Sequence, residues 1–176
     1  MGPVTPVAET MPTPGKGTEV EGATRSLDWP DVKRRLTSNG WFWLASVRPD
    51  GAPHMMPLFA AWSEPVLFIA SKDSARKSRN LDADGRCVLS TEADGAHLVV
   101  EGRASRVRDR ATLERASAAF QQTYGWPTSV AGDQLDADYG APTSGGPPYR
   151  VYQIAPTKIV ALPIDGSFLP TRLRFA

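Results

Sequence analysis

Apolar residues recur at helical spacing in three parts of the chain. Trp29, Val32 and Leu36 share one helical face, which predicts a helix that Asp28 caps and that ends before Gly40. A second helix is expected over 74–82, directly after a continuous apolar run. The third and longest is expected over 109–124, where the buried stripe would consist of Leu113, Ala116, Phe120 and Tyr124.

Short apolar runs separated by turn residues predict strands joined by hairpins. Asp50-Gly51 predicts a type I′ turn, and Asp94-Gly95 predicts a second hairpin. Six or seven mostly sequential strands with two or three helices indicate a mainly β, antiparallel fold, most economically a small barrel. The expected strands cover residues 41–47, 53–62, 66–71, 86–92, 97–107, 149–155 and 158–162.

One domain over 26–164 with a tail at each end accounts for the length of 176 residues. Residues 1–25 contain almost no large apolar side chain, so we expect a disordered N-terminal tail. Residues 165–176 are expected to be a solvated C-terminal tail that carries Arg172 and Arg174. The long loop 127–148 is rich in Pro, Gly, Asp and Ser, and we expect it, with Trp126, to cover a substrate.

Composition narrows the classes of function. Net charge is +1, which argues against a nucleic-acid-binding or membrane-surface protein, and no apolar run reaches the roughly 20 residues of a membrane span. No signal-peptide pattern is present, and the single Cys87 fits a reducing cytoplasm, where it is expected to be a small core residue. One Cys with the two distant residues His54 and His97 is a poor zinc set, so no metal site is expected.

Three cations begin the helix expected over 74–82. Arg76, Lys77 and Arg79 lie at the positive end of the helix dipole, where cations normally reduce stability. This placement indicates a site for an anion, most plausibly a phosphate, because helix N-termini present free N–H groups. A solvated helix face explains the segment about equally well.

The strand expected over 53–62 contains Pro57 at its middle, where proline removes a hydrogen-bond donor of the ladder. Such a gap is tolerated in an edge strand, or where a flat ligand faces the backbone. His54, Met55 and Met56 precede it and offer a donor and soft apolar contacts. An edge strand whose methionines fill core gaps is the simpler interpretation.

Together these segments resemble the pyridoxamine 5′-phosphate oxidase-like split-barrel proteins. The order and spacing of residues 48–57, 74–81 and 99–104 carry the resemblance, which covers roughly 28–162. The sequence is most similar to the flavin- and deazaflavin (F420)-dependent oxidoreductases of actinobacterial type. The resemblance implies an FMN-binding type of split β-barrel that forms a homodimer, with the cofactor in a groove between the subunits.

The resemblance also implies roles for individual residues. The cofactor ring would lie along His54, Met55, Met56 and Pro57. Ala70 and Ser71 would approach the ribityl chain, and Arg76 and Lys77 would hold the phosphate with Arg79 nearby. The anion inferred from the cationic helix start and the phosphate implied by the resemblance therefore coincide.

Departures from the family pattern guide the choice of activity. The oxidase itself has an Arg and a Lys in the strand equivalent to 53–58, where this chain has none, so pyridoxamine phosphate oxidation is not expected. Arg76, Lys77 and Arg79, with Lys72 nearby, could serve either FMN or coenzyme F420, whose longer anionic tail a wider basic surface would favour. The resemblance to the deazaflavin-dependent group favours F420, with FMN as the alternative.

The expected reaction is hydride transfer between the reduced cofactor and a small organic acceptor. Its proton would come from solvent or from a residue such as Tyr124 or Tyr149, and no catalytic side chain is assigned. A cofactor carrier or sensor without turnover is the other alternative.

Overall fold

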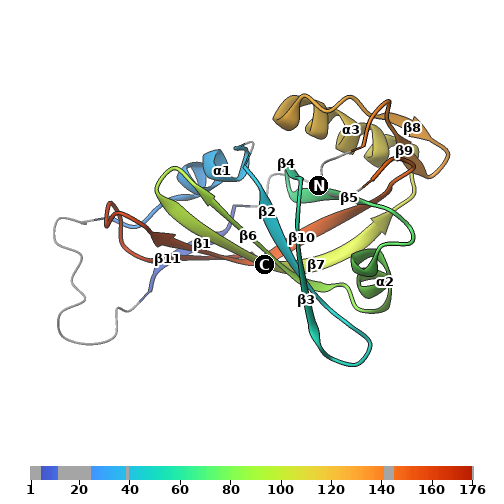
Figure 1. The fold of residues 1–176 in the computed structure, drawn as a ribbon. Helices are drawn as coiled ribbons and strands as arrows, with labels where there is room; N and C mark the ends of the chain where they lie inside the picture. The colour runs from blue at the N-terminus through green and yellow to red at the C-terminus, as the bar shows by residue number, and fades with distance from the viewer. Residues whose placement is uncertain (1–4, 12–24, 39, 141–144, 176) are drawn as a thin grey trace.

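An antiparallel sheet dominates the structure (Figure 1). The computed structural model describes residues 5–11, 25–38, 40–140 and 145–175. In chain order its elements are β1 (Val7–Thr10), α1 (Trp29–Leu36), β2 (Phe42–Val47), β3 (Pro53–Leu58), β4 (Ala60–Ser63), β5 (Val66–Ser71), α2 (Arg76–Ala83), β6 (Arg86–Ala93), β7 (Ala96–Val107), α3 (Arg110–Tyr124), β8 (Ser129–Ala131), β9 (Gln134–Asp136), β10 (Arg150–Pro163) and β11 (Thr171–Arg174).

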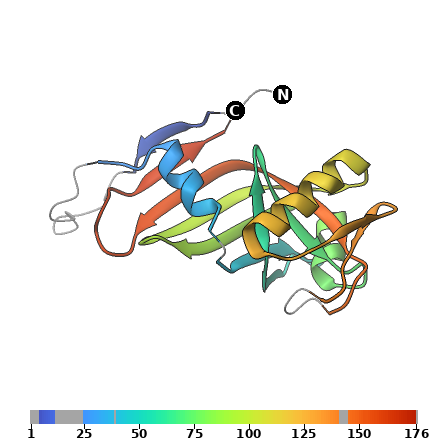
Figure 2. The same ribbon diagram turned by 90° about the horizontal axis from the view of Figure 1, so that it is seen from above.

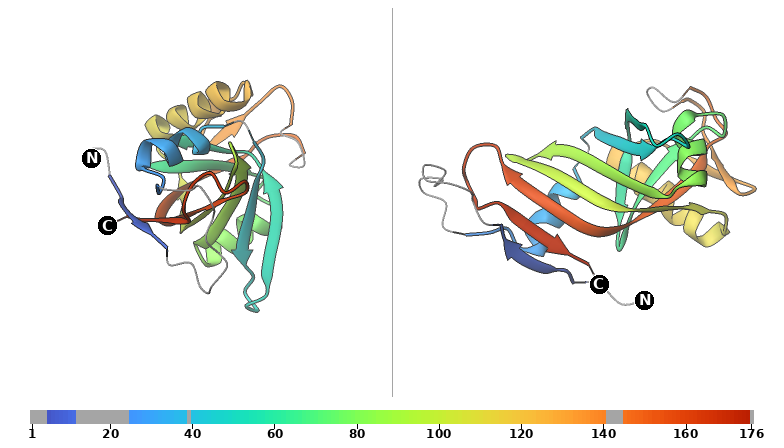
Figure 3. Two further views of the ribbon diagram at one scale, coloured as in Figure 1. Left: turned by 90° about the vertical axis from the view of Figure 1, so that its left-hand side faces the viewer. Right: turned by 90° about the horizontal axis from the view of Figure 1, so that it is seen from below.

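The long strand β10 organises the main sheet, whose strand order is β1-β11-β10-β7-β6-β2-β3. Its first half lies between β7 and β5, and its second half lies between β7 and β11. The register shifts between Pro156 and Lys158, where one half gives way to the other. The expected mainly β, antiparallel fold of split-barrel type is confirmed, although the sheet does not close into a barrel (Figure 3).

Two clusters of buried side chains form the core. Strand β5 is buried along its whole length because it contributes to both: Leu67 and Ile69 pack into one cluster, and Phe68 packs into the other. The larger cluster fills the inside of the sheet beneath α1, and the smaller one lies beneath α3. Helices α1 and α3 therefore cover the sheet, whereas α2 lies at the end opposite β1 and β11 (Figures 1 and 2).

The predicted helix starts are confirmed where a local cap defines them. The Asp28 carboxylate accepts from the Asp31 N–H at 2.9 Å, and the Asp109 carboxylate accepts from the Thr112 N–H at 2.9 Å. Helix α3 ends at Gly125, whose φ of 63° is left-handed. No helix in the described part of the chain is long and apolar enough to cross a membrane.

Three details of the strands differ from the prediction. The strand expected over 53–62 breaks at Phe59 into β3 and β4, which pair with different partners. The two strands expected over 149–155 and 158–162 are one strand, β10, with a bulge. Among the residues at the β2–β3 turn only Gly51 has a positive φ, of 83°, so this turn is not type I′.

Both expected tails contain a strand. Thr171 and Leu173 are fully buried, and β11 pairs with the second half of β10. Strand β1 then pairs with β11, and Glu9 lies near the guanidinium groups of Arg172 and Arg174. The expectation of a disordered N-terminus therefore fails for Val7–Thr10, and its other residues before Arg25 lie largely outside the described ranges.

The segment 127–148 is partly ordered by the β8–β9 hairpin. Leu135, which is fully buried, packs into the smaller core cluster, and its backbone bonds to Tyr149. Trp126 is 2% exposed and packs edge-on against Phe120, so it belongs to the core and does not face a substrate. Residues 141–144 of the expected lid lie outside the described ranges.

Gly102 offers a test of the contact between β7 and β10. A Cβ at this position would lie 2.5 Å from the Ala155 carbonyl oxygen and 3.1 Å from the Ile154 side chain. We expect Gly102→Ala to lower the free energy of unfolding by about 1–3 kcal/mol, because overpacking forces β10 to shift. Urea denaturation measures the change. Gly146→Ala, where a Cβ has no neighbour within 4 Å, is the matched control, and an equal loss in both variants would contradict the contact.

Candidate functional site

The junction between β5 and α2 is fixed by hydroxyl groups. The Ser78 hydroxyl lies 2.6 Å from the Lys72 carbonyl oxygen and 2.9 Å from the Ser71 hydroxyl. Ala75 is the N-cap residue of α2 and has no side chain that could accept from the first turn. The N–H groups at the start of α2 are therefore uncapped by side chains, as an anion site requires.

Lys77 is the unusual residue of this helix start. It is only 6% exposed, and burial lowers the pKa of its ammonium group. Arg76 and Arg79, on the same helix, are exposed. Within the described residues, none of these three side chains forms an ion pair, and the same holds for Lys72 and Arg48.

The carboxylates near α2 are paired with other cations. Arg150 on β10 binds Asp73 and also Asp82, whose carboxylate lies 2.6 Å from its guanidinium. Asp84 accepts from Arg86 at 2.6 Å, and hydrogen bonds from Arg86 lower the pKa of Asp84 to about 2. The five cations Arg48, Lys72, Arg76, Lys77 and Arg79, called here the cation cluster, are thus left with uncompensated charge.

Strand β3 brings His54 to this cluster. Burial is the main cause that lowers the pKa of His54, and the charges of Arg48, Lys77 and Arg76 lower it further. Beside His54, Asn80 of α2 donates to the Ser46 hydroxyl at 3.0 Å. Helix α2 is therefore bonded to β2 at Ser46, the register partner of His54, and its first-turn cations act on His54.

Two buried polar atoms near the cation cluster have no hydrogen-bond partner among the described residues. One is Nδ1 of His54 and the other is Oδ1 of Asn80, a residue that is fully buried. Buried polar groups are normally satisfied, so these atoms indicate that a ligand or water completes the site.

The other predicted residues divide into surface and core positions. Met55 and Met56 are 56% and 38% exposed on β3, and Pro57 pairs with Trp43 of β2. Strand β3 ends the order of the main sheet, which confirms the interpretation of an edge strand, but the expectation that its methionines fill core gaps is wrong because both are exposed. Ala70 and Ser71 are buried, so their side chains do not reach the surface of the site.

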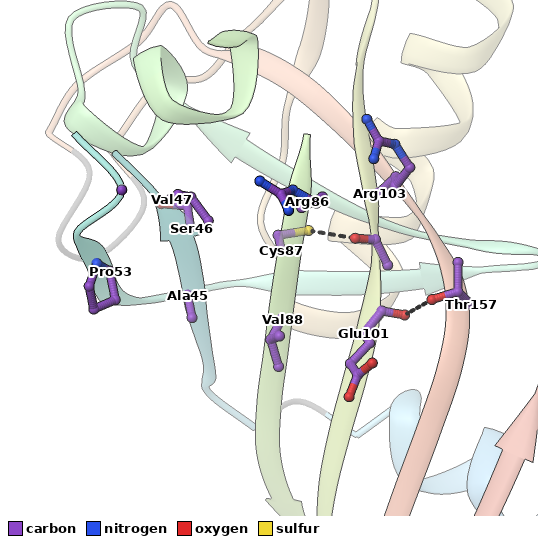
Figure 4. A pocket seen from close by; sticks show the side chains of 12 residues that line it. Ala45, Ser46, Val47, Pro53, Arg86, Cys87, Val88, Glu101, Arg103 and Thr157 are labelled. Carbon is purple, nitrogen blue, oxygen red and sulfur yellow. Dashed lines mark hydrogen bonds between the residues drawn. The ribbon is translucent and has the colours of Figure 1, made fainter. Parts of the chain in front are cut away.

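A pocket of about 770 Å³ lies on the outer face of the sheet next to the hairpin between β2 and β3 (Figure 4). Ala45, Val47 and Val88 give it an apolar floor, because these residues alternate with core residues on β2 and β6. Arg86 and Arg103, which pair across β6 and β7, line one part of it (Figure 4).

Cys87 is the core residue that the sequence predicts. It is 7% exposed, its thiol lies 3.7 Å from the Gly102 carbonyl oxygen, and burial raises its pKa to about 12. The thiol is therefore protonated and is not a nucleophile at neutral pH.

The two tyrosines considered as proton sources have hydroxyl groups that bond to the backbone, and Tyr124 is partly buried. The Tyr124 hydroxyl bonds to the Gly40 and Ala60 carbonyl oxygens at 3.0 Å, and burial raises its pKa to about 12. Tyr149 is fully buried, and its hydroxyl donates to the Gly145 carbonyl oxygen. Both hydroxyl groups are thus engaged by backbone carbonyl oxygens, and Gly145, the partner of Tyr149, lies beside the Lys72 side chain.

Sequence reasoning missed several residues of the site. Arg48, Ser46 and Asn80 reach it only through the hairpin of β2 and β3 and the packing of α2. The one available signal was Asn80 itself, a polar residue three positions after Lys77 on the face of α2 that also carries Leu81 into the core.

The fold is an antiparallel split sheet, with cations that form no ion pairs among the described residues at the junction of a buried strand and a short helix. The chain belongs to the pyridoxamine 5′-phosphate oxidase family, whose sequence profile matches residues 29–162. No curated protein matches the sequence.

Solved structures of several proteins share the fold. A conserved hypothetical protein from Mycobacterium tuberculosis has a TM-score of 0.61 at 16% identity, covering 81% of this chain and 88% of the other. An FAD-binding protein from Mesorhizobium loti has a TM-score of 0.55 at 16% identity, covering 96% and 97%. A protein named F420 reductase has a TM-score of 0.50 at 20% identity, covering 72% and 94%.

Substitution of Arg150 tests whether this residue keeps Asp73 and Asp82 from pairing with the cation cluster. We expect Arg150→Met to weaken the binding of inorganic pyrophosphate by about tenfold, because Asp73 and Asp82 would then compete with the anion for the cation cluster. Isothermal titration calorimetry measures the affinity. Arg110→Met removes an equal charge and an ion pair on α3, and it should leave the affinity unchanged. Equal affinities of the Arg150 variant and the parent protein would contradict this role.

Proposed function

We propose that the protein is an oxidoreductase that binds coenzyme F420 and transfers a hydride between the reduced coenzyme and a small organic acceptor. The observation that carries the proposal is the cation cluster, which has no carboxylate partners among the described residues and lies beside the edge strand β3. Membership of the pyridoxamine 5′-phosphate oxidase family and the fold shared with an F420 reductase support it.

The residues present fit such a coenzyme. Arg76 and Lys77, with the uncapped N–H groups of α2, would hold its phosphate, since Arg binds phosphate through two bonds and Lys as a point charge. The ring would lie along β3 from His54 to Pro57, where an edge strand leaves backbone groups accessible. The coenzyme supplies the hydride chemistry, and the chain's residues supply orientation and exclusion of water.

The number of cations favours F420 over FMN. A single phosphate is satisfied by two or three charged donors, whereas the cluster has five. Lys72 and Arg79 extend the charge beyond the phosphate position, toward where an anionic tail would continue. An FMN-dependent oxidoreductase is the alternative, which the fold shared with an FAD-binding protein supports. A carrier or sensor without turnover binds the same ligands and differs only in lacking acceptor reduction.

A homodimer is part of the proposal. Trp43 and Met55 are 48% and 56% exposed on the outer face of the sheet, next to the apolar floor formed by Ala45 and Val88. Contiguous apolar surface of this kind marks an interaction site in soluble proteins. A second copy seated on this face would cover the ring of the coenzyme and keep water from it.

The phosphate assignment predicts the effect of a double substitution. We expect Arg76→Ala with Lys77→Ala to weaken coenzyme binding by about 1.5–3 kcal/mol for each charge-assisted bond that is lost. The absorbance spectrum of the protein as purified, followed by titration with F420 and with FMN, measures the affinity and identifies the coenzyme. Reduction of electron-poor alkenes by the loaded protein then separates an enzyme from a carrier.

The matched control removes the same two residue types from another helix. Lys33→Ala with Arg34→Ala deletes a Lys-Arg pair on α1 that bonds to Glu64 and Asp31, and it should leave coenzyme affinity unchanged. Unchanged affinity of the α2 double variant for both coenzymes would refute the phosphate assignment, and a preference of the parent protein for FMN would select the alternative.

The dimer predicts that a charge on the outer face separates the subunits. We expect Met55→Glu to sediment as a monomer in analytical ultracentrifugation and to lose coenzyme affinity in parallel, because a carboxylate is costly to bury in an apolar interface. Val7→Glu, at a position 66% exposed on β1, should remain a dimer. A parent protein that sediments as a monomer when loaded with coenzyme would contradict the proposed assembly.

A further inference from the structure

His54 occupies an unusual position for a titratable residue. It lies on β3, and its register partner is Ser46 of β2, whose hydroxyl accepts from Asn80 of α2. Its Nδ1 atom is buried and has no hydrogen-bond partner among the described residues. The neighbouring Asn80 is fully buried and also has one unpaired atom, Oδ1. His54 and Asn80 therefore each have one buried polar atom without a hydrogen-bond partner among the described residues.

The charged groups that act on His54 are all positive. They are Arg48 from the turn after β2, and Arg76 and Lys77 from α2. The groups packed beside it from β2 and α2, Ser46 and Asn80, are neutral. No carboxylate of the described residues opposes these three cations at His54, because Asp73 and Asp82 bind Arg150. The unliganded site thus favours the neutral imidazole.

A doubly charged anion bound among these cations would change the electrostatic potential at His54 from positive toward negative. It would lie among the cations that now repel a proton from His54, and it would add a negative charge within reach of the imidazole. The two buried atoms without a hydrogen-bond partner among the described residues indicate a bond that the protein alone does not make. His54 is partly buried and its Nδ1 atom is fully buried, so water screens the interaction less than it would at an exposed site.

We propose that His54 is a proton-coupled member of the anion socket, which takes up a proton from solvent when a dianionic group such as a phosphate binds to the cation cluster. The inference rests on the proposed function, because it concerns the same site. The new element is that protonation of His54 makes the affinity for the anion depend on pH.

The direction of the coupling follows from linkage. Burial and the neighbouring cations lower the pKa of His54 in the free protein, and the bound anion raises it. Binding therefore consumes a proton in the pH range between the two pKa values, and affinity increases as the pH falls through that range. An opposite charge within hydrogen-bond reach shifts a pKa by about one unit or more, which corresponds to about tenfold in affinity.

The chain makes this measurable, because it contains only two histidines. Proton NMR resolves the two imidazole resonances, and a titration between about pH 8 and pH 5 gives each pKa with and without saturating sulfate. Sulfate is the probe because its own charge does not change in this range. We expect the His54 resonance to titrate at clearly higher pH with sulfate, and the His97 resonance to be unaffected.

Calorimetry with sulfate in two buffers of different ionisation enthalpy measures the coupled proton directly. We expect proton uptake below pH 7 and about tenfold tighter binding at pH 5.5 than at pH 8. His54→Gln should bind sulfate with little pH dependence, whereas His97→Gln, the matched control on β7, should behave as the parent protein. Circular dichroism of both variants verifies that they fold.

The outcomes separate this inference from the proposed function. Binding of sulfate and of F420 or FMN without any shift of the His54 resonance would overturn the proton coupling and leave the socket intact. Proton uptake that persists in His54→Gln would overturn it equally. Sulfate coupling at His54 without affinity for either coenzyme would support the inference and refute the coenzyme.

Discussion

Uncompensated positive charge at the junction of β5 and α2 is the constraint on which the site depends. Three cations at the positive end of a helix repel one another and oppose the helix dipole, and burial of Lys77 adds a desolvation cost. The surrounding structure supports this arrangement through bonds that do not use the cations: Ser78 anchors the helix start, and Arg150 holds Asp73 and Asp82. The charge is thereby kept available for a ligand.

The sheet places two further surfaces next to that charge. Because β10 pairs on both sides along its length, the main sheet extends from β1 and β11 at one end to β3 at the other, and β3 remains an edge beside α2. The outer face of β2 and β6 adjoins this edge and is apolar. The proposed coenzyme, which has an anionic end and a flat ring, would contact the cations with its anionic end and the apolar face with its ring.

Local signals predicted much of the structure. The caps at Asp28 and Asp109 are bonds between residues three positions apart, and the cations of α2 are contiguous, so both could be identified without knowledge of the fold. Strands β1 and β11 could not, because β1 pairs directly with β11, a segment more than a hundred residues later in the chain, and β11 is held in turn by the second half of β10. The residues of a short strand do not specify which other strand it pairs with, because that partner is brought close only by the rest of the fold.

Some residues of the site could likewise be identified from a short stretch of sequence, and others only from the fold. Arg76 and Lys77 follow from the sequence alone, whereas the role of His54 follows only from its placement beside them and beside Asn80. In the oxidase that the sequence resembles, the equivalent strand carries permanently charged residues. A histidine in that strand has a charge that depends on its surroundings, so the same cation cluster that recruits an anion also determines when His54 can contribute to holding it. The composition of the strand thus converts a fixed electrostatic socket into one whose strength responds to the ligand and to pH.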